Sequence, residues 1–156
     1  MLEEVYFSLG TNLGNREKNI NEALFRMQEA FSCSPVAVSD FLETEPWGFC
    51  SENRFINCVV RFDIDMNPEA ILKTVKSIEE RMGRDTRDIL YDISGRRVYQ
   101  SRIIDIDILL CGKLRYDSET LHIPHLLMAK RDFVMIPLRQ IVSEKTMSSF
   151  HDIFGE

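Results

Sequence analysis

Residues 103–110 read Ile-Ile-Asp-Ile-Asp-Ile-Leu-Leu and place two carboxylates inside an otherwise apolar run. Its length and β-branched residues predict a core strand. Because side chains alternate along a strand, Asp105 and Asp107 share one face and the neighbouring isoleucines share the other. Two residues of rise set the carboxylates roughly 6–7 Å apart, and at an effective dielectric constant of about 20 their repulsion is on the order of 2–3 kcal/mol. We favour a pair that holds cations; solvated carboxylates on an edge strand are the alternative.

Paired hard oxygen ligands favour Mg²⁺, which usually accompanies a phosphate-bearing substrate. The segment before the strand supports this interpretation. From Arg81 to Arg102 there are six arginines and three aspartates, so the segment carries +3 and the remaining chain −9, within a net charge of −6. Arginine binds phosphate in a two-pronged manner, so a local basic segment in an acidic chain indicates one anionic ligand. A solvated loop is the alternative, and the net negative charge argues against general nucleic-acid binding.

Composition predicts a single domain over residues 1–156. The hydrophobic fraction of 44% and the charged fraction of 28% are ordinary for a soluble protein. No apolar stretch approaches the roughly 20 residues that span a membrane, and the acidic start predicts no signal peptide. The four cysteines show no CxxC spacing, which favours reduced thiols in a cytoplasmic protein.

Hydrophobic periodicity predicts strands at 4–9, 35–41, 55–62 and 103–111 and helices at about 16–31 and 68–82. Asn15 and Asn67 are the expected N-caps, and Gly83 is the expected stop of the second helix. The order βαββαβ is that of an α+β, ferredoxin-like core, a mainly antiparallel sheet with helices packed on it.

A C-terminal helical extension is expected after this core. Residues 113–117 are expected to form a short hairpin partner for the last strand. Residues 126–142 are predicted to be partly helical, and a last helix over 146–154 would be capped by Thr146 and stopped by Gly155. Such a fold implies no function by itself.

Other residues suggest what binds beside the carboxylates. There is no Walker A loop and no GxGxxG motif, so arginines and Mg²⁺ would have to hold any nucleotide phosphates. Phe55 and Asn57 share one face of a strand, and an aromatic plate beside an amide suits a flat heterocycle. Equally compatible is a core role for Phe55, with Asn57 as a capped polar residue of the strand. His125 is expected to be a hydrogen-bond donor rather than a metal ligand.

These residues together resemble one family, the 6-hydroxymethyl-7,8-dihydropterin pyrophosphokinases of folate biosynthesis. The matching segments follow the family's order: 8–14 (Ser-Leu-Gly-Thr-Asn-Leu-Gly), 44–48 (Thr-Glu-Pro-Trp-Gly), 55–57 (Phe-Ile-Asn), 78–79 (Ile-Glu), 83–84 (Gly-Arg), 102–109 (Arg-Ile-Ile-Asp-Ile-Asp-Ile-Leu), 124–128 (Pro-His-Leu-Leu-Met), 131–134 (Arg-Asp-Phe-Val) and 137–138 (Pro-Leu). Each segment is weakly informative, whereas the ordered set is highly specific.

The resemblance implies a ferredoxin-like α+β core and the transfer of pyrophosphate from ATP to the pterin hydroxymethyl group, with AMP leaving. It also implies roles for individual residues, by position. These are Asp105 and Asp107 as ligands of two Mg²⁺ ions, Arg84 and Arg102 as catalytic arginines, His125, Arg131 and Arg97 at the ATP phosphates, Ile108 at the adenine, Phe55 and Phe133 as plates around the pterin, Asn57 as its polar reader, and the backbone of Thr44 and Trp47 at its edge.

Some points stay open. Residues 97–102 differ from the family's usual Arg-Trp-Gly-Pro-Arg, so Arg87 and Arg96 are alternatives to Arg97 at the nucleotide. A Mg²⁺-dependent nucleotidyltransferase with the same aspartates would release pyrophosphate rather than AMP. A non-catalytic, RNA-binding ferredoxin-like module is disfavoured by the negative charge and by the lack of an aromatic-rich signature on strand 55–62. We expect a monomer that binds small molecules, without a nucleic-acid or membrane partner.

Overall fold

The computed structural model describes residues 1–44, 54–83, 90–91, 97–98 and 103–155. Their elements are β1 (Glu3–Thr11), α1 (Arg16–Phe31), β2 (Ala37–Val38), β3 (Leu42–Thr44), β4 (Phe55–Ile64), α2 (Pro68–Arg81), β5 (Leu90–Tyr91), β6 (Arg97–Val98), β7 (Asp105–Cys111), β8 (Tyr116–Asp117), β9 (His122–Ile123), the 3₁₀ helix η2 (Met128–Lys130), α3 (Asp132–Ile141), α4 (Glu144–Ser149) and α5 (His151–Phe154). In these ranges no helix has the length and apolar character of a membrane span.

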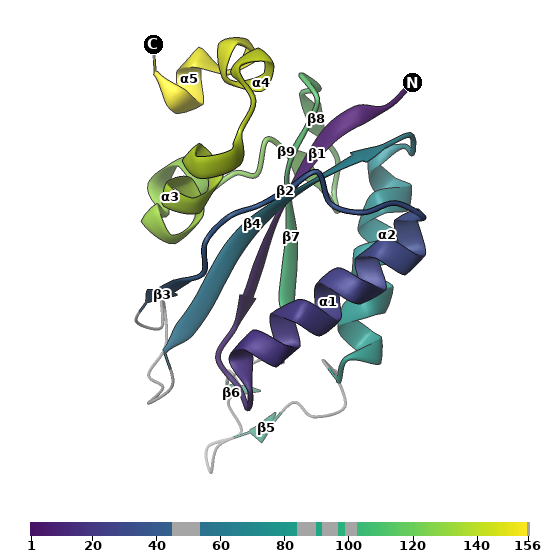
Figure 1. Ribbon diagram of the computed structural model, residues 1–156, viewed down its shortest axis with the longest axis vertical. Helices are drawn as coiled ribbons and strands as arrows, with labels where there is room; N and C mark the ends of the chain where they lie inside the picture. Colours follow the sequence, from purple (N-terminus) through teal and green to yellow (C-terminus); the bar gives the residue numbers. More distant parts are fainter. Residues whose placement is uncertain (45–53, 84–89, 92–96, 99–102, 156) are drawn as a thin grey trace.

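The centre of the fold is a five-stranded antiparallel sheet in the order β2-β4-β1-β7, with β3 also paired to β4 (Figure 1). Strand β1 therefore lies between the third and fourth strands of the predicted βαββαβ core. This is the ferredoxin-like arrangement, and it confirms the α+β fold class expected from the sequence.

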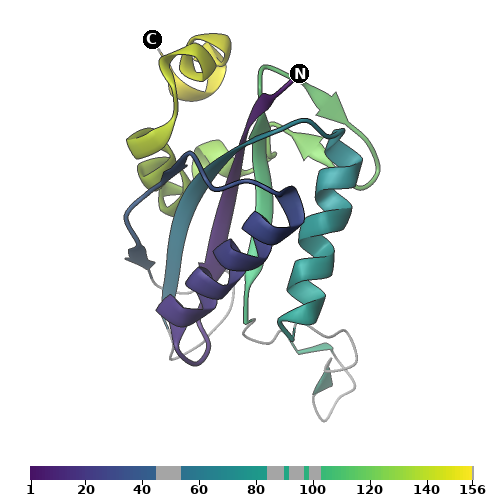
Figure 2. The same ribbon diagram turned by 45° about the vertical axis from the view of Figure 1, so that its right-hand side comes forward.

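Helices α1 and α2 lie side by side on one face of the sheet (Figure 2). Both begin where the sequence predicts, because Asn15 accepts a hydrogen bond from the Lys18 backbone N–H and Asn67 accepts one from Ala70. Their apolar stripes and the inner face of the sheet form the larger core, which includes Phe7, Leu9, Ile20, Ala23, Leu24, Met27, Ile56, Cys58, Val60, Phe62, Ile71, Val75, Ile78, Ile104, Ile106 and Ile108.

The opposite face of the sheet is covered by the C-terminal helices α3, α4 and α5 (Figure 1). A second core forms there, from Tyr6, Val59, Leu109, Leu110, Met128, Val134, Met135, Leu138, Phe150 and Phe154. The predicted C-terminal helical extension is thus a second layer. Its last segment is divided into α4 and α5, and the cap of α4 is Ser143, whose hydroxyl accepts the Thr146 N–H, rather than Thr146 itself.

Two predicted strands differ from the structure. The strand expected over 35–41 is divided into β2 and β3, because the Ser39 hydroxyl accepts the Val59 N–H at 2.8 Å between them and takes the place of a ladder bond. The strand expected over 113–117 pairs with β9 instead of β7. The cause lies on α2, where the carboxylate of Glu69 accepts hydrogen bonds from Tyr116, Ser118 and Thr120 at 2.6–2.9 Å.

Candidate active site

The two aspartates of β7 lie on the face of the sheet that carries α3. In the ladder, Asp105 is opposite Gly10 and Asp107 is opposite Ser8, while the isoleucines on either side are buried under α1 and α2. Both aspartates are partly buried. The alternation predicted from the sequence is therefore confirmed, and the carboxylates lie together on one side of the strand.

The pair carries an electrostatic cost that a cation would relieve. Burial raises the pKa of Asp107 above its ordinary value, and the charge of Asp105 raises it further. The charges of Lys76 and Arg131, and that of His125 when its ring is protonated, act in the opposite direction. Two carboxylates with hard oxygen donors on one face fit a divalent cation such as Mg²⁺.

His125 follows β9, and its backbone N–H donates to the carbonyl of Leu109 on β7 at 3.0 Å. Its Nδ1 accepts the Leu127 N–H at 3.2 Å, which assigns the ring proton to Nε2. Burial lowers the pKa of the imidazole, and although the charge of Asp107 opposes this, Arg131 and His122 lower it further. A neutral His125 can therefore donate one hydrogen bond from Nε2.

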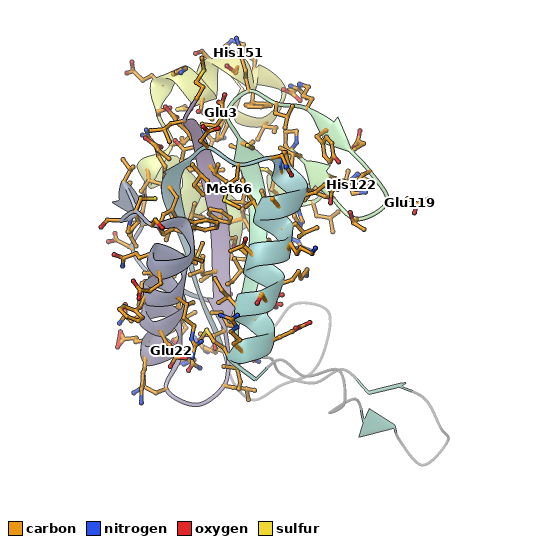
Figure 3. The ribbon with its side chains drawn as sticks, turned by 90° about the vertical axis from the view of Figure 1, so that its right-hand side faces the viewer. Glu3, Glu22, Met66, Glu119, His122 and His151 are labelled. Atoms are coloured by element: carbon orange, nitrogen blue, oxygen red, sulfur yellow. The ribbon has the colours of Figure 1, made fainter. Side chains whose placement is uncertain are left out.

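The other histidine of this region points elsewhere. His122 lies on the β8–β9 hairpin beside α2 (Figure 3), and its Nδ1 is 2.8 Å from an Asp117 oxygen. Within the residues that the structure describes, no group of three or more His, Cys, Asp or Glu side chains is placed to hold a metal ion. The aspartate pair would accordingly share a cation with other ligands, such as phosphate oxygens.

Arg131 and Phe133 lie at the start of α3. The guanidinium carbon of Arg131 is 5.6 Å from the centre of the Phe133 ring, within the range of a cation–π contact. The charge of Arg131 acts on both Asp107 and His125. Asp107 of β7, His125 in the loop after β9 and Arg131 at the start of α3 therefore form one cluster of interacting ionisable groups.

A second group of predicted site residues lies across β1 from the aspartates. Gly10 is paired with Asn57 of β4 on one side and with Asp105 of β7 on the other. Asn57 is buried, and its Nδ2 donates to the Thr44 hydroxyl at 3.3 Å. Phe55 is half-buried and is paired with Thr44 at the end of the β3–β4 ladder. The amide and the carboxylates are therefore one strand apart on the same face, about 10 Å between their backbones.

Gly10 is required by this arrangement, and the sequence interpretation gave it no role. A Cβ at position 10 would lie 2.5 Å from the Asn57 Oδ1, far inside van der Waals contact. The missing side chain leaves room for the amide over β1. The available signal was a glycine directly after the predicted strand 4–9, within the family segment 8–14.

Several predicted site residues cannot be placed in this geometry. Arg84, Arg102 and Trp47 lie outside the described residues, as do Arg87 and Arg96, and only the backbone of Arg97 is described, in β6. The side chain of Ile108 is buried in the core under α1 and α2. A contact between Ile108 and a ligand would have to come from its backbone.

Two residues of α2 belong to the site region although the sequence interpretation assigned them no role. Glu79 is buried and accepts a hydrogen bond from the Ile106 N–H, and Lys76 lies 3.5 Å from Glu79 and contributes to the field at Asp107. The signal for Glu79 was present in the sequence. It stands between Ile78 and Met82 on the stripe that faces the core, where a charged residue is unusual.

Comparisons with known proteins place the chain among the ATP-dependent pyrophosphokinases, which are enzymes. It belongs to the family described as 7,8-dihydro-6-hydroxymethylpterin-pyrophosphokinase (HPPK), whose family model matches residues 6–143. This confirms the family resemblance found in the sequence.

Two relatives carry the name 2-amino-4-hydroxy-6-hydroxymethyldihydropteridine pyrophosphokinase. The protein of Porphyromonas gingivalis is 40% identical over 138 residues, 88% of this chain and 89% of the relative. That of Bacillus subtilis is 31% identical over 139 residues, 89% of this chain and 78% of the relative. A solved HPPK-DHPS protein in complex with substrates has the same fold, with a TM-score of 0.65 and 15% identity; the match covers 97% of this chain and 43% of that larger protein.

Proposed function

We propose that the protein transfers pyrophosphate from ATP to the hydroxymethyl group of 6-hydroxymethyl-7,8-dihydropterin and releases AMP, in folate biosynthesis. Family membership supports the reaction. The observation that carries the proposal to this chain's own residues is the position of Gly10, which separates Asn57 from Asp105 by one strand on the same face of the sheet. An amide that can recognise a heterocycle thus lies close enough to a pair of cation ligands for a pterin and the ATP phosphates to be bound side by side.

The reaction forms one bond and breaks one bond. The hydroxymethyl oxygen attacks the β-phosphorus of ATP, the bond from this phosphorus to the α,β-bridging oxygen breaks, and the hydroxyl proton is lost. Negative charge develops on the bridging oxygen of AMP and on the oxygens around the β-phosphorus. Catalysis of such a step is chiefly positioning and charge stabilisation.

Asp105 and Asp107 are the residues that would hold two Mg²⁺ ions. When bound, Mg²⁺ supplies neutralising charge to phosphate oxygens and makes an attached hydroxyl more acidic. Arg131 adds a fixed positive charge beside Asp107, and neutral His125 offers its Nε2 proton to a phosphate oxygen. Arg84, Arg102 and Arg97 complete the proposed set of phosphate contacts, and the backbone of Ile108 is proposed for the adenine.

The pterin is proposed to lie over β1 and β4. Asn57 carries both amide donors and an acceptor, which suits the edge of a pterin ring. Phe55 and Phe133 are the proposed plates on its two faces, with the backbone of Thr44 and Trp47 at its edge. We propose further that the protein acts as a monomer in the cytoplasm and binds neither nucleic acid nor membranes.

The test is incubation with ATP, Mg²⁺ and the hydroxymethyl-dihydropterin, with separation of the nucleotide products. AMP formed in step with the pterin diphosphate supports the proposal. Release of pyrophosphate would instead indicate a nucleotidyltransferase, and salt-sensitive RNA binding without turnover would indicate a binding module. Asp105→Ala and Asp107→Ala test the role of the two aspartates in this reaction. Each should lower turnover by more than about 100-fold because each removes a proposed metal ligand.

A further inference from the structure

Glu79 is a buried carboxylate on the inner face of α2. Its side chain is 3% exposed. Burial of a carboxylate is costly unless hydrogen bonds and opposite charges compensate it. Lys76, one turn earlier, lies 3.5 Å from Glu79 Oε1 and supplies part of that compensation. A side chain kept there at such cost has a task that an apolar residue would not perform.

The task is shown by the other oxygen of the carboxylate. Glu79 Oε2 accepts the backbone N–H of Ile106 at 2.7 Å. Ile106 is the residue between Asp105 and Asp107, and β7 is an edge strand of the sheet among the strands that the structure describes. The N–H groups on the outer edge of such a strand have no neighbouring strand to accept them. A carboxylate gives this one a short, charge-assisted bond.

A second anchor holds the same part of the strand from the other side. The Thr11 hydroxyl of β1 donates to the carbonyl of Ile103, two residues before Asp105. The end of α2 also packs closely there, because a Cβ at Gly83 would lie 2.7 Å from the Ile103 side chain. The beginning of β7 is therefore fixed by β1 on one edge and by α2 on the other.

We propose that Glu79 is a positioning residue for the cation site: its bond to Ile106 fixes the pleat of β7 so that Asp105 and Asp107 both project from the face of the sheet that carries α3. A shift of one residue would turn both aspartates into the core and the isoleucines out of it. The hydrogen bond to Ile106, which lies between the two aspartates, resists that shift. It also resists smaller rotations of the strand about its own axis. This inference rests on the proposed function insofar as the aspartates are its metal ligands.

Two conservative variants separate the hydrogen bond from the charge. Glu79→Gln keeps the length of the side chain and an oxygen acceptor but removes the charge. Glu79→Asp keeps the charge, but its side chain is one methylene shorter and does not reach Ile106. The measurement is Mn²⁺ binding to the protein with a non-hydrolysable ATP analogue, by electron paramagnetic resonance, together with circular dichroism and thermal unfolding to check the fold.

We expect Glu79→Gln to bind Mn²⁺ within about threefold of the wild type and Glu79→Asp to bind it about tenfold more weakly, the scale on which supporting residues affect metal sites. Lys73→Met, which removes an exposed charge from the same helix and leaves both Lys76 and the bond to Ile106 in place, is the control and should resemble Glu79→Gln. Equal affinity in a folded Glu79→Asp overturns the inference. So does a tenfold loss in Glu79→Gln, whether or not Glu79→Asp folds.

The variant Asp105→Asn separates this inference from the proposed function. If Asp105→Asn leaves wild-type Mn²⁺ affinity unchanged, the proposed metal site is wrong and the inference about Glu79 is wrong with it. If Asp105→Asn abolishes Mn²⁺ binding and both Glu79 variants bind like the wild type, only the positioning role is overturned.

Discussion

Asp107 shows how one residue can oppose folding while serving a site. Burial and the charge of Asp105 raise its pKa. A carboxyl whose pKa is higher in the folded than in the unfolded state stabilises the fold at low pH, and this contribution is lost as the pH rises through the folded-state pKa. At neutral pH, without a cation, ionised Asp107 therefore lowers the free energy of unfolding.

Asp107→Asn should accordingly make the cation-free protein more stable and inactive. We expect its Tm at pH 7.5 to rise by roughly 2–4 °C, the shift that about 1 kcal/mol gives in a chain of this length, and its turnover to fall by more than about 100-fold. Thermal unfolding without and with Mg²⁺ measures the first effect. Asp65→Asn, an exposed carboxylate paired with the N-terminus, is the control. A lower Tm for the Asp107 variant contradicts the explanation.

A substitution at Gly10 tests the proposed pterin-binding part of the site. Gly10→Ala should displace the Asn57 amide, because the new Cβ would lie 2.5 Å from its oxygen. The loss of one buried hydrogen bond, about 1–1.5 kcal/mol, corresponds to pterin binding weaker by about tenfold. Calorimetric titration with the pterin measures this affinity. In a double-mutant cycle, Asn57→Ala should add little to Gly10→Ala, and fully additive losses would separate the two residues.

Helix α1 contacts the two strand ends that flank the β3–β4 connection. These strand ends, at Glu43–Thr44 and Arg54–Phe55, are called the stem of the connection. The guanidinium of Arg16 lies 2.8 Å from a carboxylate oxygen of Glu43 and donates to the carbonyl of Arg54 at 2.8 Å. These two residues directly flank Thr44 and Phe55 in the chain. Arg16 therefore ties together both sides of the stem on which proposed pterin contacts lie.

Arg16→Met should weaken pterin binding by about three- to tenfold, because the stem loses its shared donor, and should leave Mn²⁺ binding unchanged. The range corresponds to about 0.7–1.4 kcal/mol, the usual net contribution of one intramolecular hydrogen bond. The matched control is Arg26→Met on the same helix, which removes an i,i+4 pair with Glu22 remote in sequence from the stem. Equal pterin affinity in the two variants would show that Arg16 does not set the stem.

Elements with local signals are the ones that the sequence predicts well. Helix α1 has the predicted bounds, and both asparagine caps are confirmed. Strands that depend on distant partners are predicted less well: the division at Ser39 needs Val59, and the pairing of β8 with β9 needs Glu69. The site follows the same rule. Alternation along β7 gives the face of the aspartates, whereas the positions of Gly10 and Glu79 depend on strand register and helix packing.

Glu4 joins the sheet to the C-terminal layer. Its Oε1 accepts hydrogen bonds from Ser143 at 2.5 Å, Thr146 at 2.8 Å and Tyr6 at 3.2 Å, and Arg61 lies 3.4 Å from Oε2. Burial opposes ionisation, but these hydrogen bonds and the arginine outweigh it and lower the pKa of Glu4. The ionised carboxylate therefore stabilises the attachment of α4 to β1.

Glu4→Gln should reduce stability in a pH-dependent manner. A lowered folded-state pKa gives a contribution that is present above the unfolded value of 4.5 and is lost as the pH falls through the folded-state pKa. We expect a Tm lower than wild type by roughly 2–4 °C at pH 7, with the difference shrinking below pH 4.5. Thermal unfolding across this range measures it, with exposed Glu29→Gln as the control. A difference that is independent of pH would contradict the role of ionised Glu4.

The layout of the sheet also bears on modularity. The N-terminal start of β1 and the last helix α5 lie at one end of the molecule (Figure 1), whereas β1 reaches Gly10 and β7 begins with Asp105 at the other end. A tag, a surface anchor or a second enzyme attached through a short linker at either terminus would therefore lie at the end of the molecule opposite the proposed substrate site. The protein can therefore be extended or immobilised at either terminus without obstructing the proposed active site.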